Sequence, residues 1–370
     1  MITCQDYRVA DPDALETPSM LLFRDMMEHN IRSACEIAGG GQNLVAHVKT
    51  HKSEAVTRKQ IELGIHGFKC ATLKELEMVL QAGAKKAILS YPQCQERKIE
   101  RLCDLTSSHP DAWIATIVSS TFHLDVLAAV AMRRKQPLRV MMDLDAGMHR
   151  TGSKFGADAV NLYRDIDARP FLQPSGFHLY DGHENYRDVV QREGAAQRHI
   201  ESLQELQQQL ESAGTSVPCM VAGGSYSFIC YARTEGMQGS PGTFVYWDAR
   251  YRTNMPDMPF RCAALILTQV VERYPDAGTI TTDLGSKGIS SDLAVEERAY
   301  LIGRDTAKLV SQSEEHGVFR IPGELPGVGD YLLAVPGHIC PTTIRYPGIH
   351  VIDSDGNVVD YYSHAARDRL

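Results

Sequence analysis

Short β-like runs alternate with longer helix-like runs from residue 17 to about residue 230 of this 370-residue chain. Such alternation is typical of parallel sheets, because parallel neighbours need a crossover connection that is usually a helix. Eight β-like runs stand out, at 17–23, 44–48, 67–70, 86–90, 112–118, 138–144, 175–180 and 217–223. The pattern predicts an α/β fold, a (β/α)8 TIM-like barrel. A doubly wound open sheet is the alternative, but no GxGxxG motif follows the first run.

The segment 72–83, "TLKELEMVLQAG", shows how clearly the helices are marked. Its leucines and valine recur at helical spacing and form one apolar face. Thr72 and Glu75 have the spacing of a capping box, and Gly83 can end the helix. Residues 195–214 give a second helix of this kind, which ends at Gly214.

The sequence changes character after about residue 255, where β-rich segments follow one another without helices between them. The tetrapeptide "SDGN" at 354–357 lies between two β-branched runs and predicts a hairpin. We therefore expect a second, C-terminal β-domain. The expected division is a barrel over 15–255 and a β-domain made of 1–14 plus 256–370.

Composition excludes several classes of protein. Apolar residues make up 43% of the chain, which is ordinary for a globular protein. The net charge of −8 argues against nucleic-acid binding. No apolar run is long enough to span a membrane, and the acidic N-terminus does not have the pattern of a signal peptide. The nine cysteines are dispersed without CxxC pairs, which indicates reduced thiols and a cytoplasmic location.

The stretch "NLVAHVKTHKS" ends an apolar run on Lys49, with His47 and His51 on either side. On a strand these three residues would share one face. Lys49 then stands at the C-terminal end of the second predicted barrel strand, where such barrels place their active sites. Crowding and desolvation there would favour a free amine. The alternative is a solvated lysine at the end of a strand.

Two glycine-rich turns could hold an anion. "VAGGSYSF" follows the eighth predicted strand, and "GSPGTF" comes shortly after it. Consecutive glycines let backbone N–H groups approach a phosphate closely, and barrels commonly bind phosphate at such loops. A structural turn without a ligand is the alternative for either segment.

Two further loops bring polar side chains to the same predicted end of the barrel. "DLDAGMHRTG" contains Arg150, which could pair with an anionic oxygen or with a neighbouring aspartate. "HLYDGHENY" is rich in imidazole and phenol groups that suit hydrogen bonding or proton transfer.

The segment "PGHICPTT" of the β-domain holds His338 and Cys340 two residues apart. On a strand they would share a face and form half of a divalent-metal site. A lone HxC pair is a weak signal by itself.

Taken together, these segments resemble the D-threonine aldolase and D-serine dehydratase group of fold-type III pyridoxal phosphate enzymes, whose barrel is similar to that of alanine racemase. The resemblance covers nearly the whole chain and depends most on "HVKTHKS", "GGSYS" with "PGTF", and "PGHICPT". It implies that Lys49 carries pyridoxal 5'-phosphate as a Schiff base and that His338 and Cys340 bind the metal. The implied phosphate-binding residues are Gly223, Gly224, Ser225, Ser227, Gly242 and Thr243. Arg150 and Tyr180 are expected beside the cofactor ring, with Tyr180 also counted among the catalytic residues.

The resemblance implies a homodimeric lyase that acts on a D-3-hydroxy amino acid with the help of Mn²⁺, Mg²⁺, Co²⁺ or Zn²⁺. The expected reaction is that of a D-threonine aldolase, which releases glycine and an aldehyde. A dehydratase for D-serine or D-3-hydroxyaspartate would use the same cofactor and metal. A racemase or a non-catalytic pyridoxal phosphate-binding protein are the further alternatives.

Overall fold

The structure, a computed structural model, describes residues 1–369 as two compact units. We call them the barrel unit, which contains Ala34–Lys49 and Thr57–Gly242, and the β unit, which contains Met1–Ser33, Thr50–Val56 and Thr243–Arg367. Neither unit is one continuous stretch of chain. Within the described residues, no helix is both long and apolar enough to span a bilayer.

The barrel unit is built on eight parallel strands in sequence order, which confirms the predicted fold class. A parallel bridge between Leu44 and Gly239 brings the first and last strands together, so the sheet curls into a barrel. The strands are β4 (Val45–His47), β5 (Gly67–Cys70), β6 (Lys86–Leu89), β7 (Trp113–Val118), β8 (Leu138–Asp145), β9 (Leu172–Tyr180), β10 (Met220–Ala222) and β11 (Met237–Gly239).

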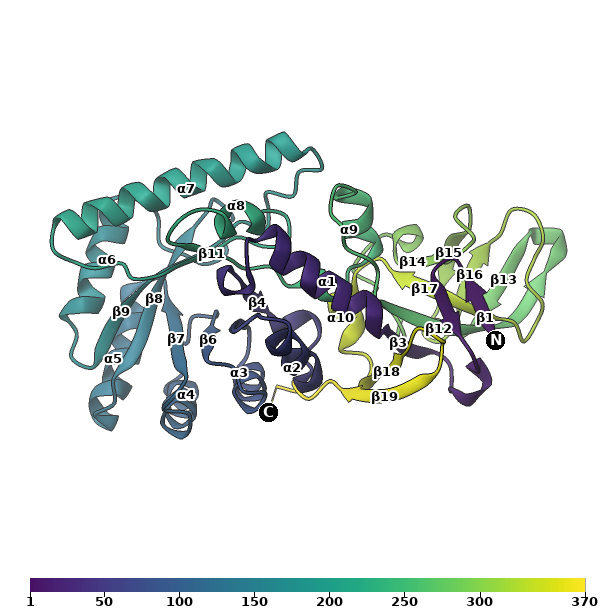
Figure 1. The fold of residues 1–370 in the computed structure, drawn as a ribbon, viewed down its shortest axis with the longest axis horizontal. Coiled ribbons are helices and arrows are strands. Elements are labelled where there is room, and N and C mark those ends of the chain that lie inside the picture. Colours follow the sequence, from purple (N-terminus) through teal and green to yellow (C-terminus); the bar gives the residue numbers. More distant parts are fainter. Residues whose placement is uncertain (370) are drawn as a thin grey trace. The chain divides into compact units, whose positions relative to one another are not determined.

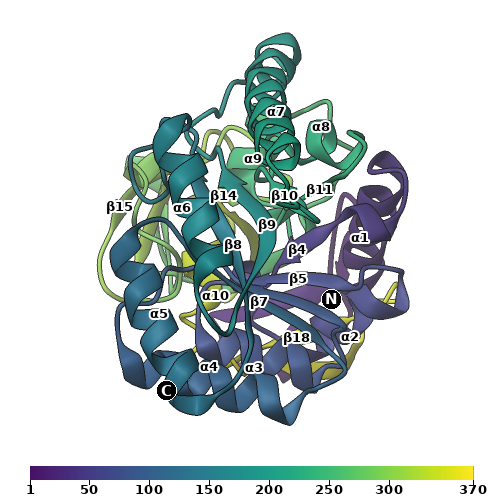
Figure 2. The ribbon, with the colours of Figure 1, turned by 90° about the vertical axis from the view of Figure 1, so that its left-hand side faces the viewer.

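Helices cover the outside of this sheet, as Figure 2 shows for the strands β5 to β9. The helices after the strands are α2 (Glu54–Glu62), α3 (Leu73–Gln81), α4 (Glu96–Ser108), α5 (Thr121–Arg134), α6 (Ala157–Ala168), α7 (Val189–Ser212) and α8 (Phe228–Ala232). The predicted capping box is present on α3, where the Thr72 hydroxyl accepts from the Glu75 backbone N–H at 3.1 Å. The predicted helix at 195–214 is most of α7.

Side-chain alternation divides the apolar residues of the strands between two cores. One core joins the helices to the outward-facing strand residues, and the other is formed by strand residues alone. The second core fills the inside of the barrel with Val45, Ile88, Ala115, Ile117, Met141 and Val221. Because residues two apart on a strand share a face, the next inward layer of β8 and β9 contains Asp143 and His178. The barrel is therefore apolar at mid-height and polar at its C-terminal mouth.

The β unit is a mostly antiparallel sheet whose strands run in the order β15-β16-β13-β12-β3-β18-β19, with β17 pairing with β12 and β14. Figure 1 labels these elements. The strands are β3 (Ser19–Phe23), β12 (Ala264–Tyr274), β13 (Thr279–Thr282), β14 (Ala299–Leu301), β15 (Lys308–Gln312), β16 (Gly317–Arg320), β17 (Tyr331–Pro336), β18 (Gly348–Ile352) and β19 (Val358–Ser363). The predicted hairpin at "SDGN" joins β18 to β19. The N-terminal strands β1 (Ile2–Cys4) and β2 (Tyr7–Val9) form a separate hairpin.

The assignment of residues 17–23 as the first barrel strand is wrong. Strand β3 lies in the β unit, where it pairs with β12 and β18, and all of its residues are buried. A continuous apolar run of this length has no period that could distinguish a barrel strand from the central strand of another sheet. The eighth barrel strand is β11, whose three residues "MQG" carry no strand signal.

Because residues 17–23 are not a barrel strand, the loops follow barrel strands whose numbers are one lower than predicted. Lys49 follows the first barrel strand, and the two glycine-rich loops follow the seventh and the eighth. These last two loops are the ones that most often bind phosphate in barrels of this kind.

Gly176 on β9 provides a test of how tightly the barrel closes. Its φ of +110° suits glycine, and a Cβ there would overlap the backbone of Cys219. We expect Gly176→Ala to lower the free energy of unfolding by roughly 2–4 kcal/mol, because strain and a backbone clash add up. Gly194 on α7 is the control, since nothing lies within 4 Å of its position. Gly194→Ala should raise stability by about 0.5–1 kcal/mol in the same denaturant titration.

Candidate active site

Three of the predicted residues meet at the barrel mouth around the ring of Tyr180, the last residue of β9. The Nζ atom of Lys49 lies 5.5 Å from the ring centroid, and the Cζ atom of Arg150 lies 4.9 Å from it. Lys49 is in a short 3-10 turn, Val48–Thr50, immediately after β4, and Arg150 is in the loop after β8. The mouth therefore presents one amine and one guanidinium beside an aromatic ring.

The expectation that His47, Lys49 and His51 share one face of a strand is wrong, because β4 ends at His47. Only His47 belongs to the strand, while His51 lies in the β unit and is fully buried. Burial, followed by the nearby His364, lowers the pKa of His51 to about 3. His51 accepts a hydrogen bond from the Ser53 N–H at 3.1 Å, which gives it a structural role in the turn.

A second lysine at the mouth was missed by the sequence analysis. Lys69 on β5 is 2% exposed, and its Nζ atom lies 5.6 Å from the centroid of the Tyr180 ring. Burial is the largest cause that lowers its pKa, to about 7, and the charge of Lys49 is the next. The signal was visible in "GFKC", where a charged residue interrupts a short buried run.

A buried acid–imidazole pair forms part of the inner layer below the mouth. The Nδ1 atom of His178 lies 2.6 Å from Oδ1 of Asp143. Burial lowers the pKa of His178 more than its bond to Asp143 raises it. The outer atoms of the pair, Asp143 Oδ2 and His178 Nε2, are buried without a hydrogen-bond partner among the described residues. Both residues line a cavity of about 30 Å³ together with Arg150 and Tyr180.

The loop after β10 exposes bare backbone at two consecutive glycines, Gly223 and Gly224. A Cβ at Gly223 would come within 2.8 Å of the Ser227 hydroxyl, and one at Gly224 within 2.9 Å of the Tyr180 ring. Gly223 also has a φ of +84°, which favours glycine. The backbone of this loop can therefore approach a ligand more closely than any substituted residue would allow.

Asp181 holds this loop in place through hydrogen bonds from two hydroxyl groups. The Ser227 hydroxyl donates to Asp181 Oδ1 at 2.8 Å and accepts from the Gly224 N–H at 3.2 Å, while the Tyr231 hydroxyl donates to Asp181 Oδ2 at 2.9 Å. Burial raises the pKa of Asp181 despite these bonds. Ser227 thus lies in this loop, but in this conformation its hydroxyl proton is directed to Asp181.

The second glycine-rich loop, after β11, meets the first. The Gly242 N–H donates to the hydroxyl of Ser225 at 3.5 Å, and Thr243 follows directly in the chain. Two loops that offer backbone N–H groups and a hydroxyl around glycines are chemically suited to a phosphate group. The residues present therefore fit the phosphate of pyridoxal 5'-phosphate.

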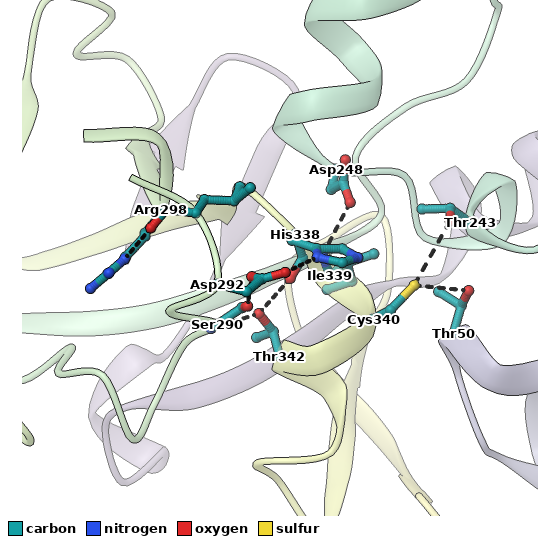
Figure 3. Close-up of polar contacts among 11 residues, drawn as sticks. Thr50, Thr243, Asp248, Ser290, Asp292, Arg298, His338, Ile339, Cys340 and Thr342 are labelled. Carbon is teal, nitrogen blue, oxygen red and sulfur yellow. Dashed lines mark hydrogen bonds and ion pairs between the residues drawn. The ribbon is translucent and has the colours of Figure 1, made fainter. Parts of the chain in front are cut away.

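The predicted metal pair lies in the β unit, where Figure 3 shows His338 and Cys340 on the same side of the short helix α10 (Ile339–Thr343). The expectation that they share a strand is wrong, because β17 ends at Pro336 and His338 is the N-cap of the helix. Burial lowers the pKa of His338, but its hydrogen bond to Cys340, the Cys340 charge and the bond to Asp292 outweigh it and raise the pKa to about 9.

Asp292 orients the imidazole and was not predicted. Its Oδ2 atom lies 2.6 Å from Nδ1 of His338, which directs Nε2 to Cys340. Such a carboxylate partner is typical of metal-binding histidines. Within residues 1–369 no third histidine, cysteine or carboxylate completes a metal-binding cluster. The pair therefore fits a metal as a two-ligand site with coordination positions left for other ligands.

Three residues fix the position of this pair, and Figure 3 shows their contacts. Asp248 accepts from the backbone N–H of Ile339 at 3.1 Å and is fully buried. The hydroxyl oxygens of Thr50 and Thr243 lie 3.3 Å and 3.8 Å from the sulfur of Cys340. Thr50 is the residue after Lys49, and Thr243 is the residue after Gly242.

Comparison with known proteins places the chain in a family. Residues 24–250 match the model of the alanine racemase N-terminal domain, and residues 263–352 match that of a putative serine dehydratase domain. The chain therefore belongs to the alanine racemase-like, fold-type III family of pyridoxal phosphate proteins, in the branch that carries a serine dehydratase-type second domain.

Several individual relatives are lyases. The chain is 26% identical to a 3-hydroxy-D-aspartate aldolase of Paracoccus denitrificans over 90% of this chain and 87% of the relative. It is 24% identical to a D-threo-3-hydroxyaspartate dehydratase of Delftia over 93% and 96% of the two chains. Its fold matches a D-threonine aldolase structure from Filomicrobium marinum with a TM-score of 0.89 at 24% identity, over 99% of both chains.

Asp248 gives a test of how the metal pair is held. Asp248→Ala removes the acceptor for the N–H groups of Ile339 and Tyr251 and should lower the free energy of unfolding by roughly 2–5 kcal/mol. Asp248→Asn keeps an acceptor oxygen and should cost less. Asp276→Ala, at an exposed position of the same unit, should change stability by less than about 0.5 kcal/mol. Equal stability of Asp248→Ala and Asp276→Ala in chemical denaturation would contradict this account.

Proposed function

We propose that the protein is a pyridoxal 5'-phosphate- and divalent metal-dependent lyase that cleaves D-3-hydroxy amino acids to glycine and an aldehyde. The observation that carries the proposal is the Lys49 amine beside Tyr180 and Arg150 at the mouth of a barrel of this family. The metal-type pair His338 and Cys340 in the same chain supports a substrate with a hydroxyl group.

In this proposal the barrel unit holds the cofactor. Lys49 would bind it covalently, Tyr180 and Arg150 would lie against its ring, and the loops containing Gly223 and Gly242 would hold its phosphate. The cofactor supplies an electron sink for the bond at the substrate α-carbon. Asp181 would keep the first loop in shape through Ser227 and Tyr231. The apolar layer below the mouth would keep water out of the barrel interior beneath the cofactor.

The β unit would hold the metal through His338 and Cys340, with Asp292 fixing the imidazole. A divalent ion bound there would act as a Lewis acid that favours loss of the proton from a β-hydroxyl group. Mn²⁺, Mg²⁺, Co²⁺ and Zn²⁺ are the candidates. Among the solved structures with this fold is a variant of the Delftia dehydratase in a metal-free form, which supports testing metal dependence directly. By the same resemblance we propose a homodimer.

A dehydratase is the second candidate. The match of residues 263–352 to a serine dehydratase domain and the likeness to the Delftia dehydratase favour it. It would remove the α-proton of D-serine or D-3-hydroxyaspartate and expel the hydroxyl group. A racemase or a non-catalytic binding protein would need neither His338 nor Cys340.

The test is to incubate the protein, pyridoxal phosphate and Mn²⁺ separately with D-threonine, D-3-hydroxyaspartate and D-serine. We expect glycine and an aldehyde. Ammonia with a 2-oxo acid would establish the dehydratase instead. Inversion at the α-carbon would identify a racemase, and the absence of any product would favour the binding protein.

Lys49 is predicted to form the covalent bond to the cofactor. Lys49→Ala should lose the visible absorption band of bound pyridoxal phosphate after dialysis, because no attachment point is left. The exposed Lys85→Ala should keep the band unchanged. A wild-type spectrum for Lys49→Ala would show that another group binds the cofactor.

Removing the divalent metal with a chelator should distinguish the proposed role of the β unit from that of the barrel unit. EDTA should abolish turnover and leave the visible band intact, and added Mn²⁺ should restore turnover. Asp292→Asn should weaken metal affinity by about 10–100-fold, because the imidazole loses its orienting carboxylate. His338→Ala should lose the metal at ordinary concentrations, whereas the exposed His316→Ala should bind it normally. Full activity in EDTA would rule out a metal-assisted reaction.

A further inference from the structure

Lys69 is a buried lysine side chain whose ammonium group lies over the ring of Tyr180. It is 2% exposed, yet among residues 1–369 its ammonium group forms neither a hydrogen bond nor an ion pair. Burying an uncompensated charge is costly, so lysines in such places normally carry a partner or change their protonation state. An apolar residue of similar length would fill the same space at lower cost. The burial of a lysine at this position therefore indicates that Lys69 has a role other than packing.

The register of the sheet directs Lys69 to the inside of the barrel. It lies opposite His47 on β4 and Ile88 on β6, and Ile88 belongs to the interior core. Residues in register on adjacent strands point to the same side. Lys69 therefore points into the barrel interior, as Asp143 and His178 do.

Lys69 shares its surroundings with Lys49. The Nζ atoms of the two lysines lie 5.6 Å and 5.5 Å from the centroid of the same ring, that of Tyr180. Two amines this close to one ring in a buried place repel each other when both are protonated. The charge of Lys49 is the largest cause after burial that lowers the pKa of Lys69.

Charges from every neighbouring element act on Lys69. Burial, followed by the charges of Lys49 and Arg150, lowers the pKa of Lys69 to about 7 against the opposing effect of Asp143 and Asp181. On the same face, Lys69 is also one of the charges that lower the pKa of His178. Near neutral pH a large fraction of Lys69 is thus a neutral amine, which can accept a proton.

We propose that Lys69 accepts the proton that Lys49 must lose before its amine can react with the cofactor aldehyde. This inference rests on the proposed function of Lys49. The transfer converts Lys49–NH₃⁺ and Lys69–NH₂ into Lys49–NH₂ and Lys69–NH₃⁺, so charge and atoms are conserved. The free amine then condenses with the aldehyde, and one water leaves. Lys69 acts through Lys49, which makes it a positioning residue.

The test measures how fast pyridoxal phosphate attaches to the full-length protein after the cofactor has been removed. The rate of appearance of the visible band is followed from pH 6 to 10 for wild type, Lys69→Met and Lys69→Gln. The exposed Lys85→Met is the matched control. Thermal unfolding of the cofactor-free proteins is measured in parallel, because it reports on folding independently of attachment.

We expect Lys69→Met to slow attachment at pH 7.5 by at least about tenfold. The loss should appear as a shift of the rate–pH profile to higher pH, in which each tenfold loss of rate corresponds to about one pH unit. The rate should return to the wild-type value near pH 10, where hydroxide can replace Lys69 as the proton acceptor. The unfolding midpoint of Lys69→Met should equal or exceed that of wild type, because a buried charge has been removed. Lys69→Gln should show the same pH profile, and Lys85→Met should match wild type.

Two results would overturn the inference. Attachment at the wild-type rate over the whole pH range would show that Lys69 accepts no proton. Attachment slowed equally at every pH, together with a lower unfolding midpoint, would show a structural role alone. If the wild-type protein itself forms no visible band, the proposed function fails first, and this inference fails with it.

Discussion

Closure of eight parallel strands into one ring is the constraint on which the site depends. Parallel strands all end at the same rim, so residues far apart in the sequence, such as Lys49, Arg150 and Tyr180, meet at the C-terminal mouth. The interior layer below them is apolar and fixes the strands rigidly. The mouth can therefore hold several charged side chains close together, because packing in the rest of the barrel offsets the repulsion between them.

The metal-type pair depends on a different arrangement. Its two side chains come from one turn of chain, and carboxylates from elsewhere hold them in place. Asp292 fixes the imidazole and Asp248 fixes the backbone between the two residues. In the barrel unit, Asp181 holds the first glycine-rich loop in a comparable way through Ser227 and Tyr231. Such support is what allows a site to be formed before its ligand binds.

Most of the fold could be predicted from the sequence because hydrophobic periodicity reports directly on burial. Helix α3 was marked by its apolar face and by its capping residues, Thr72 and Glu75. Strand β3 was placed in the wrong sheet because an apolar run shows that a strand is buried but not which neighbours bury it. Strand β11 was missed because its three residues have no pattern; its place is set by the closing of the ring.

The same limit applies to the site. Lys49, the glycine loops and the pair His338 and Cys340 lie in motifs that can be read locally. Asp292 is 46 residues before His338 in the chain, and only the tertiary fold brings it there. Lys69 had a local signal, a charge in a buried run, but its meaning depends on Lys49 being beside the same ring.

The path of the chain between the two units has a consequence for how the protein can be divided. The chain passes from one unit to the other after Ser33, Lys49, Val56, Gly242 and Arg367. A fragment that begins at Thr57 would lack β4, so its barrel would have an open edge and no Lys49. A fragment that ends at Gly242 would lack β12 and β18, the two strands that pair with β3. Truncating the chain at one position cannot yield either unit complete and by itself. The two units therefore have to be expressed and folded as one chain.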